Sequence, residues 1–307
     1  MNKYSFIQKR FFFSWALAAL FALSVTAQPT AKPAPILKDK GTGGSAEVIE
    51  QKLDSKLMAR AMPYRVLTPK DYKNNVASRY AVIYLLHGLT GHYTNWTDKT
   101  ELAEYAFNHQ FIIVTSEGDN GWYTDSVATP NDKYESYIIK ELIPEIDKKF
   151  RTIADRDHRM IAGLSMGGYG AIKFGLKYPE MFSLVGSFSG AVWAASYNAK
   201  NAGDIGKGID VVLGADDSEA RRANDVFKMV RELTPERLKA APFIYLSCGT
   251  EDFIFQSSRD FNALLIEKKI PHEYREHSGI HDWVFWNDQV REFLDVAERR
   301  MAVSGKR

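Results

Sequence analysis

The chain has 307 residues, of which 45% are hydrophobic and 25% are charged, and its formal net charge at pH 7 is +2. This composition is ordinary for a soluble globular domain, and a chain of this length can form one large α/β core. The near-neutral charge and the lack of a long basic run give nucleic-acid binding no electrostatic support. The single cysteine, Cys248, excludes an intramolecular disulfide.

The first 27 residues have the pattern of a secretory signal peptide. Basic residues precede the apolar run 11–25, and small residues occupy the expected cleavage position before Gln28. The apolar run is shorter than a membrane-spanning helix requires. We therefore expect the segment to be cleaved, leaving no stable membrane anchor, and the protein to be secreted or periplasmic. Retention as an uncleaved anchor is the alternative.

The rest of the chain divides into a linker and one domain. Residues 28–46 are rich in Pro, Ala, Lys, Thr and Gly and predict a flexible linker. Residues 47–307 alternate between strand and helix patterns and are expected to form a single catalytic domain. Strands are predicted at 47–53, 56–68, 80–86, 111–115, 160–162, 184–188, 243–247 and 271–276. Helices are predicted at 98–108, 133–150 (bent at Pro144), 217–231, 257–268 and 282–301.

Continuous apolar runs such as 80–86 and 111–115 are typical of parallel strands that are buried on both faces. Together with the alternation of strands and helices, they predict the α/β class, with a mostly parallel central sheet covered by helices on both faces. Residues 190–215 contain several glycines, and we expect them to form an irregular insertion that covers the substrate. Cys248 continues the run 243–247 and is expected to be a small core residue.

A serine at position 165 lies in the strongest motif of the chain. Residues 163–167 read Gly-Leu-Ser-Met-Gly and match G-x-S-x-G, in which a nucleophilic serine occupies a sharp turn between a strand and a helix. The apolar strand 160–162 precedes the motif, and a helical stripe at 171–176 follows it and stops before Pro179. We therefore predict Ser165 as a catalytic nucleophile. A structural turn without chemistry is the alternative.

A serine hydroxyl becomes a good nucleophile only when a base takes its proton and a third group orients that base. Asp252 follows the strand 243–247, and His281 lies in the loop between the last strand and the last helix. The carboxyl ends of parallel strands meet at one edge of the sheet, so we expect Ser165, Asp252 and His281 to come together there. Other candidates remain: Glu251, Asp216, Asp217 and Asp282 for the acid, and His277 for the base.

Two backbone N–H groups should stabilise the negative oxygen that develops during ester cleavage. One is expected from Met166, the residue after the nucleophile, and the other from Leu89, in the loop after the third strand. His87, directly before the turn at Gly88, is interpreted as structural or as shaping this loop.

Trp122 and Tyr123 lie in a glycine-containing loop after the strand 111–115. They are candidates for lining a substrate pocket, and a packed aromatic pair beneath a loop is the alternative. No H-E-x-x-H motif or cysteine pair indicates zinc. We therefore expect neither a metal nor an organic cofactor.

Four of these segments together resemble the esterase D-like family of α/β-hydrolases. The resemblance runs from about Pro63 to Trp286. The segments are 85–91 (LLHGLTG), 163–168 (GLSMGG), 249–252 (GTED) and 279–283 (GIHDW). The family includes S-formylglutathione hydrolase, tributyrin-type, feruloyl and acetylxylan esterases, and bacterial mycolyltransferases.

The resemblance implies an α/β-hydrolase fold and a serine carboxylic-ester hydrolase that forms an acyl-enzyme. It implies Ser165 as nucleophile, Asp252 and His281 as its partners, and Leu89 and Met166 as oxyanion donors. The expected substrate is a small-molecule or carbohydrate ester. Two further functions stay open: acyl transfer to a sugar or lipid alcohol on the same triad, and a non-catalytic binding module on a hydrolase scaffold.

Overall fold

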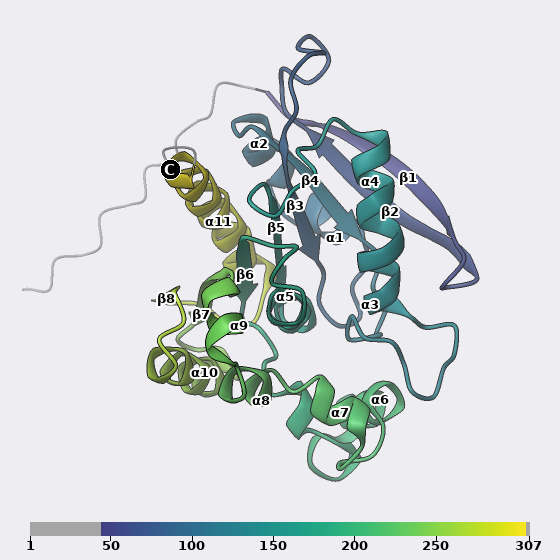
Figure 1. Cartoon of the computed structure of the whole chain (residues 1–307), viewed down its shortest axis with the longest axis vertical. Helices are drawn as coiled ribbons and strands as arrows, with labels where there is room; N and C mark the ends of the chain where they lie inside the picture. Colours follow the sequence, from purple (N-terminus) through teal and green to yellow (C-terminus); the bar gives the residue numbers. More distant parts are fainter. Residues whose placement is uncertain (1–43, 305–307) are drawn as a thin grey trace, which may run out of the picture. The chain divides into compact units, whose positions relative to one another are not determined.

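The computed structural model describes residues 44–304, and Figure 1 shows their arrangement. The predicted signal peptide, 1–27, and most of the predicted linker, 28–46, lie outside the described residues. At the end of that linker, Ala46 is buried and donates its N–H to the carbonyl oxygen of Ala103 at 2.8 Å. None of the helices between residues 44 and 304 is both long and apolar enough to span a membrane.

Eight strands form one sheet in the order β1-β2-β4-β3-β5-β6-β7-β8. Their bounds are β1 Glu47–Ser55, β2 Arg60–Thr68, β3 Ala81–Leu86, β4 Phe111–Ser116, β5 Arg159–Leu164, β6 Leu184–Phe188, β7 Phe243–Gly249 and β8 His272–His277. The strands from β3 to β8 run parallel, whereas β2 is antiparallel to both β1 and β4. The predicted α/β class with a mostly parallel sheet is confirmed.

The central strands are buried along their whole length, which explains their continuous apolar sequences. Every residue of β3, β4, β5 and β6 is buried. Successive side chains of a strand face opposite sides of the sheet. In β3, Tyr84 accordingly belongs to one hydrophobic cluster and Leu85 to another. Cys248 in β7 is also buried, as expected, and burial raises the pKa of its thiol to about 11.

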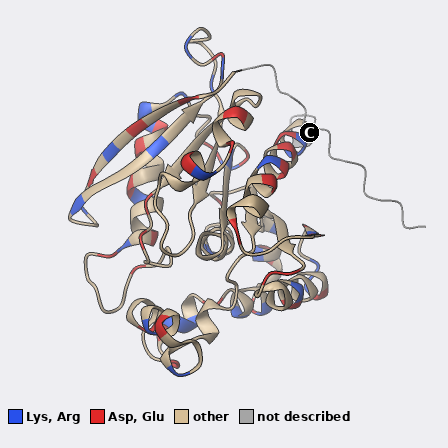
Figure 2. Ribbon diagram, turned by 180° about the vertical axis from the view of Figure 1, so that it is seen from behind, with Lys and Arg blue, Asp and Glu red and all other residues tan. Residues whose placement is uncertain are grey.

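Helices cover both faces of the sheet (Figure 1). Their bounds are α1 Asn95–Lys99, α2 Leu102–Phe107, α3 Tyr134–Tyr137, α4 Ile143–Lys149, α5 Met166–Lys177, α6 Ala199–Leu213, α7 Glu219–Ala223, α8 Val226–Arg231, α9 Pro235–Ala240, α10 Phe255–Glu267 and α11 Trp283–Ser304. Side chains of α3, α4, α5, α8 and α10 join one cluster, and those of α1, α2 and α11 join the other. Both β1 and α11 carry charges of both signs, as Figure 2 shows.

The expectation that residues 190–215 are irregular is largely wrong, because this segment contains α6, which is kinked at Ala202 and Gly203, and a short 3₁₀ turn, Ala194–Ser196. The side chain of Asn198 caps α6 by accepting hydrogen bonds from the N–H groups of Lys200 and Asn201. Glycines inside α6 hid its pattern, since glycine is a poor helix former. Gly206 lies close to the backbone at the start of α6. An added Cβ there would lie 1.9 Å from the carbonyl oxygen of Asn198, so only glycine fits.

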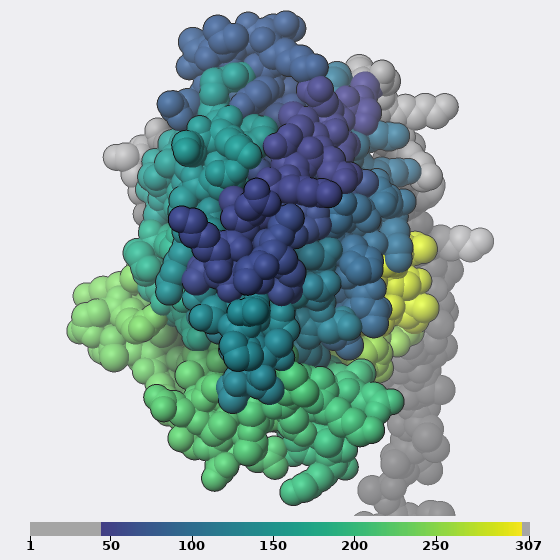
Figure 3. Space-filling model, turned by 90° about the vertical axis from the view of Figure 1, so that its right-hand side faces the viewer, coloured from purple at the N-terminus to yellow at the C-terminus, as the bar shows by residue number. Residues whose placement is uncertain are grey.

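The end of α6 lies against the loop that follows β4. Val127 and Ala128 donate their N–H groups to the carbonyl oxygens of Val212 and Val211, at 3.0 and 3.2 Å. Figure 3 shows the green atoms of the insertion next to the teal atoms of the preceding segments. Two segments distant in sequence are therefore joined above the carboxyl ends of the strands.

Three predicted helices are divided into shorter ones. The prediction 98–108 corresponds to α1 and α2, and 217–231 corresponds to α7 and α8, because Asp225 accepts a hydrogen bond from the N–H of Lys228 and starts a new helix. The prediction 133–150 becomes α3, a π-helical turn at Ile138–Leu142, and α4. Pro144 has no N–H to continue an α-helical ladder, which explains the irregular turn before it. The helix α9 was not predicted.

Candidate active site

Ser165 occupies a strained turn between β5 and α5. Its backbone has φ 51° and ψ −117°, a region that residues with a Cβ rarely adopt. The turn is tight enough to exclude a Cβ at positions 163 and 167. A Cβ added to Gly163 would lie 2.8 Å from the carbonyl oxygen of Leu86, and one added to Gly167 would lie 2.3 Å from that same oxygen. The two glycines of the motif therefore allow the serine hydroxyl to stand at the end of the sheet.

The structure brings Ser165, His281 and Asp252 together although they are far apart in sequence. His281 Nε2 lies 3.0 Å from Ser165 Oγ, and His281 Nδ1 lies 2.9 and 3.1 Å from the two carboxylate oxygens of Asp252. The Asp252 side chain is fully buried, whereas that of His281 is 20% exposed. Burial alone would raise the pKa of Asp252, but the hydrogen bonds from His281 and from the N–H of Ile254 hold it below its usual value. The carboxylate is therefore ionised and oriented toward the imidazole.

The neighbouring acid, Glu251, has a different role in this geometry. Its carboxylate accepts a hydrogen bond from the N–H of Gly279 at 2.6 Å, which ties the loop after β7 to the loop that carries His281. Asp282 accepts a hydrogen bond from the N–H of Phe285 at 3.0 Å and caps the first turn of α11. Neither Glu251 nor Asp282 is hydrogen-bonded to the imidazole of His281.

The remaining candidate acids and the second candidate base lie away from Ser165. His277 ends β8, and its Nε2 lies 3.5 Å from a carboxylate oxygen of Glu292 in α11. Asp216 accepts a hydrogen bond from the side chain of Asn198 in the insertion, and Asp217 is exposed before α7. Of the candidate acids and bases, only Asp252 and His281 make the chain of contacts to Ser165.

Leu89 and Met166, the predicted oxyanion donors, lie at the ends of β3 and β5. Met166 is the first residue of α5, and its side chain is buried. His87 Nδ1 lies 2.8 Å from the carbonyl oxygen of Gly88; because that oxygen can only accept, Nδ1 carries the proton. The Gly88 carbonyl and the Leu89 N–H belong to one planar peptide group. The His87 hydrogen bond therefore sets the direction in which the Leu89 N–H points.

Glu117, at the end of β4, holds His87 from the other side. Glu117 Oε1 lies 3.1 Å from His87 Nε2, and both atoms accept the N–H of Gly118, at 3.0 and 2.9 Å. Oε1 also accepts the N–H of Asp119 at 2.8 Å. Burial raises the pKa of Glu117, but the neighbouring His87 and the hydrogen bonds from the N–H groups of Asp119 and Tyr93 outweigh it and lower the pKa to about 2. Sequence analysis did not identify Glu117. An acidic residue directly after an apolar run was the signal that the sequence offered.

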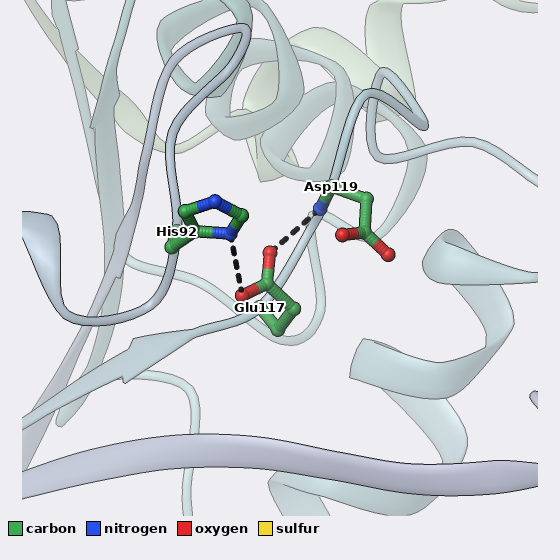
Figure 4. A group of neighbouring side chains, drawn as sticks. All are labelled: His92, Glu117 and Asp119. Atoms are coloured by element: carbon green, nitrogen blue, oxygen red, sulfur yellow. Dashed lines mark hydrogen bonds and ion pairs between the residues drawn. The ribbon is translucent and has the colours of Figure 1, made fainter.

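His92 and Asp119 flank Glu117, as Figure 4 shows. The three side chains each offer one possible metal ligand, and these atoms lie within 4.8 Å of one another. Glu117 is already engaged by backbone N–H groups, and Asp119 accepts a hydrogen bond from the hydroxyl of Tyr134. The cluster is therefore explained as an anchor for the two loops.

Trp122 and Tyr123, the candidates for a substrate pocket, are both buried, at 2% and 0% exposure. Both have positive φ values, of 50° and 51°. The Tyr123 hydroxyl donates to the carbonyl oxygen of His87 at 3.0 Å, and the Trp122 ring packs edge-on against Tyr169 and Trp193. These two aromatic residues thus support the loop after β3 and the start of the segment 190–215 from within.

A buried ion pair behind this loop was also missed. Lys173 of α5 is fully buried and donates to the carbonyl oxygen of Tyr123 and to a carboxylate oxygen of Glu135, at 2.6 and 2.8 Å. Burial lowers the pKa of Lys173 to about 8. Burial raises the pKa of Glu135, but Lys173 and Lys177 lower it to about 2. A lysine within the apolar stripe of the helix after Ser165 was the only signal in the sequence.

The comparisons with known proteins find this chain similar to esterases. A family model described as "Putative esterase" matches residues 55–294. The acetyl esterase of Caldicellulosiruptor saccharolyticus is 29% identical over 238 residues, which cover 72% of this chain and 85% of that protein. An esterase of Mycobacterium tuberculosis is 32% identical over 266 residues, or 78% of this chain. The chain spans only 57% of the length of that mycobacterial relative.

Solved structures show the same fold. A ferulic acid esterase matches with a TM-score of 0.73 and 28% identity, over 83% of this chain and 99% of the other. An S-formylglutathione hydrolase from Agrobacterium tumefaciens matches with a TM-score of 0.72 over 84% of this chain and 96% of the other. Its identity is 22%, so it supports the fold alone.

Proposed function

Because the chain belongs to the esterase family and is a carboxylic ester hydrolase, we propose that it cleaves its substrate through a Ser165–His281–Asp252 triad and an acyl-enzyme intermediate. The observation that carries this proposal is the 3.0 Å contact between Ser165 Oγ and His281 Nε2, with the buried Asp252 carboxylate on the other ring nitrogen. This is the arrangement that a general base requires.

In the proposed mechanism, Ser165 Oγ attacks the ester carbonyl carbon while His281 Nε2 accepts its proton. The resulting oxyanion accepts hydrogen bonds from the N–H groups of Leu89 and Met166. When the tetrahedral intermediate collapses, His281 gives the proton to the leaving alcohol, and Ser165 remains acylated. Water then attacks the acyl-enzyme with the same base, which releases the acid and restores the serine. Asp252 keeps the imidazole oriented and stabilises its charged form.

For the substrate, we propose a small-molecule or carbohydrate ester. The names of the relatives support this choice, since they include an acetyl esterase and a ferulic acid esterase. No metal and no organic cofactor enters the proposed mechanism, because each proton transfer has a partner among the three triad side chains.

The proposal is tested by replacing the nucleophile. Ser165→Ala should lower kcat for p-nitrophenyl acetate by about 10³ or more, because the acyl-enzyme can no longer form. Ser183→Ala is a suitable control, because Ser183 precedes β6 at the opposite end of the sheet and bonds the carbonyl oxygen of Asp157. A Ser165→Ala protein that keeps most of its turnover would refute the assignment. Labelling of the wild type, but not of Ser165→Ala, by a fluorophosphonate would exclude a non-catalytic binding module.

We also propose that the protein is exported to the periplasm or the medium. The support is the sequence of the first 27 residues, with its basic start, apolar run and small residues before Gln28. The mass of the protein purified from its native compartment decides the matter. A mature chain that begins at Gln28 supports export with cleavage, and a cytosolic full-length chain contradicts it.

A further inference from the structure

Exposed apolar side chains lie close in sequence to the proposed catalytic residues, and one of them, Phe253, contacts His281. Nine large hydrophobic residues are exposed in the part of the chain that the structure describes. Three of them, Phe253, Ile280 and Val284, lie within three residues of Asp252 or His281 in sequence. Their exposures are 74%, 54% and 75%. An exposed apolar group beside a reactive centre is typical of a ligand-binding surface.

The ring of Phe253 lies directly against the imidazole. The Phe253 and His281 ring centroids are 4.7 Å apart, and the buried ring of Trp286 lies 4.9 Å from the same imidazole. Trp286 therefore packs the histidine from the core. Most of the Phe253 side chain is exposed to solvent. Packing in the core therefore does not explain an aromatic residue at this position.

The mechanism determines which part of the substrate meets this surface. His281 Nε2 must deliver its proton to the leaving oxygen, so that oxygen must come within hydrogen-bond distance of the imidazole. The carbon atoms attached to the leaving oxygen are then close to the side chains that surround the ring. The alcohol part of the ester, rather than the acyl part, is the group that Phe253 can contact.

The charges nearby favour a neutral alcohol. The segments 249–258 and 276–290 contain no lysine or arginine. Glu251 and Asp282 place carboxylates next to the exposed apolar residues, and Glu251 is held toward this side by the N–H of Gly279. Lys99, the last residue of α1, lies over the ring of Trp283 at the start of α11, 5.3 Å from the ring centroid. An anionic alcohol would meet two carboxylates with little compensation.

We propose that Phe253, Ile280 and Val284 bind the alcohol part of the ester, and that this part is an uncharged alkyl or aryl group. The proposal rests on the proposed function, because it uses His281 as the proton donor to the leaving group. It goes further by naming the class of alcohol and the residues that select it.

Acetate esters of different alcohols test this selection, because their acyl part is constant. The measurement is kcat/KM for methyl, hexyl and 2-naphthyl acetate and for glucose 6-acetate, from the rate at which acid is released. The wild type should prefer hexyl and 2-naphthyl acetate to the other two. Phe253→Ala should lower kcat/KM for hexyl acetate about tenfold more than for methyl acetate, and chiefly through KM, as expected when an apolar contact is lost.

Two further variants sharpen the test. Val284→Ser should lower the ratio of hexyl to methyl acetate in the same direction, by about threefold, although valine has no ring to stack on the imidazole. Ile266→Ala removes a comparably exposed residue, at 61%, from the far end of α10 and should leave all four substrates unchanged. Because Phe253 and Val284 are exposed, neither substitution removes core packing.

Other outcomes overturn the proposal. If Phe253→Ala lowers activity equally for all four esters, the ring acts on the histidine and not on the alcohol. A wild-type preference for glucose 6-acetate would exclude an apolar alcohol. These results differ from a failure of the proposed function, which would show as activity retained in Ser165→Ala whatever the alcohol.

Discussion

Two aspartates near the histidine differ in what they contact, and this difference gives a test at the scale of single residues. Asp252 is buried against His281 Nδ1, whereas Asp282 caps α11 through the N–H of Phe285. Asp252→Asn should lower kcat by about 10³ to 10⁴, because an amide in this place favours the wrong tautomer of the imidazole. Asp282→Asn should change unfolding free energy by less than about 1 kcal/mol, because asparagine also caps helices well.

The measurements are kcat with p-nitrophenyl acetate and urea unfolding for both variants. The Asp282→Asn protein controls for the loss of one negative charge near the site. A larger loss of kcat in Asp282→Asn than in Asp252→Asn would give the orienting role to Asp282.

The loop after β3 gives a test at the scale of an element. His87→Ala removes the hydrogen bond to the Gly88 carbonyl, so the Leu89 N–H is no longer directed. We expect kcat to fall by about 10² while KM changes little, since an oxyanion donor acts in the transition state. His87→Asn places an amide N–H near the position of Nδ1 and should recover part of the lost kcat.

This pair of variants separates orientation of the loop from general destabilisation. If His87→Ala and His87→Asn lose stability equally in urea but differ in kcat, the hydrogen bond to Gly88 is the cause. An unchanged kcat in His87→Ala would show that His87 does not position the Leu89 N–H.

Some elements could be predicted from sequence and others could not, for physical reasons. The runs of β3 and β4 are apolar because both faces of these strands are buried, so their sequence alone identifies them. The helix α6 carries glycines that weaken its helical pattern, and its start depends on a cap at Asn198. The boundary between α7 and α8 depends on a single cap at Asp225.

The same limit applies to the candidate site. Sequence order indicated Ser165, Asp252 and His281, but only geometry separates Asp252 from its neighbour Glu251, whose carboxylate bonds Gly279. The pair Lys173 and Glu135 is 38 residues apart in sequence, and no local pattern predicts that they meet. The sequence likewise does not reveal that the side chain of Phe253 is exposed, because burial depends on the fold.

The stability of the whole molecule should depend on two buried carboxylates. The pKa values of Glu117 and Glu135 are lowered to about 2 from an ordinary value of 4.5. A lowered pKa means that the unfolded state binds protons more readily. The stabilisation from these groups is therefore fully present above pH 4.5 and is lost as pH falls toward 2.

Thermal unfolding across this acidic range measures the effect. We expect Tm to fall steeply below pH 4.5 in the wild type, with a shallower fall in Glu135→Gln, whose side chain cannot titrate. Glu104→Gln is the control, because Glu104 is exposed in α2. Equal slopes in Glu135→Gln and the wild type would show that the buried carboxylate does not contribute to acid unfolding.

The buried thiol of Cys248 has a consequence for how the intact fold can be observed. Thiol reagents attack the thiolate, and a pKa of about 11 keeps nearly all of this thiol protonated at neutral pH. The residue stands in β7 between two neighbouring strands, four positions before Asp252, so a reagent reaches it only when the sheet opens. The rate at which an alkylating reagent modifies this single cysteine therefore measures how often the centre of the sheet exchanges with an open state.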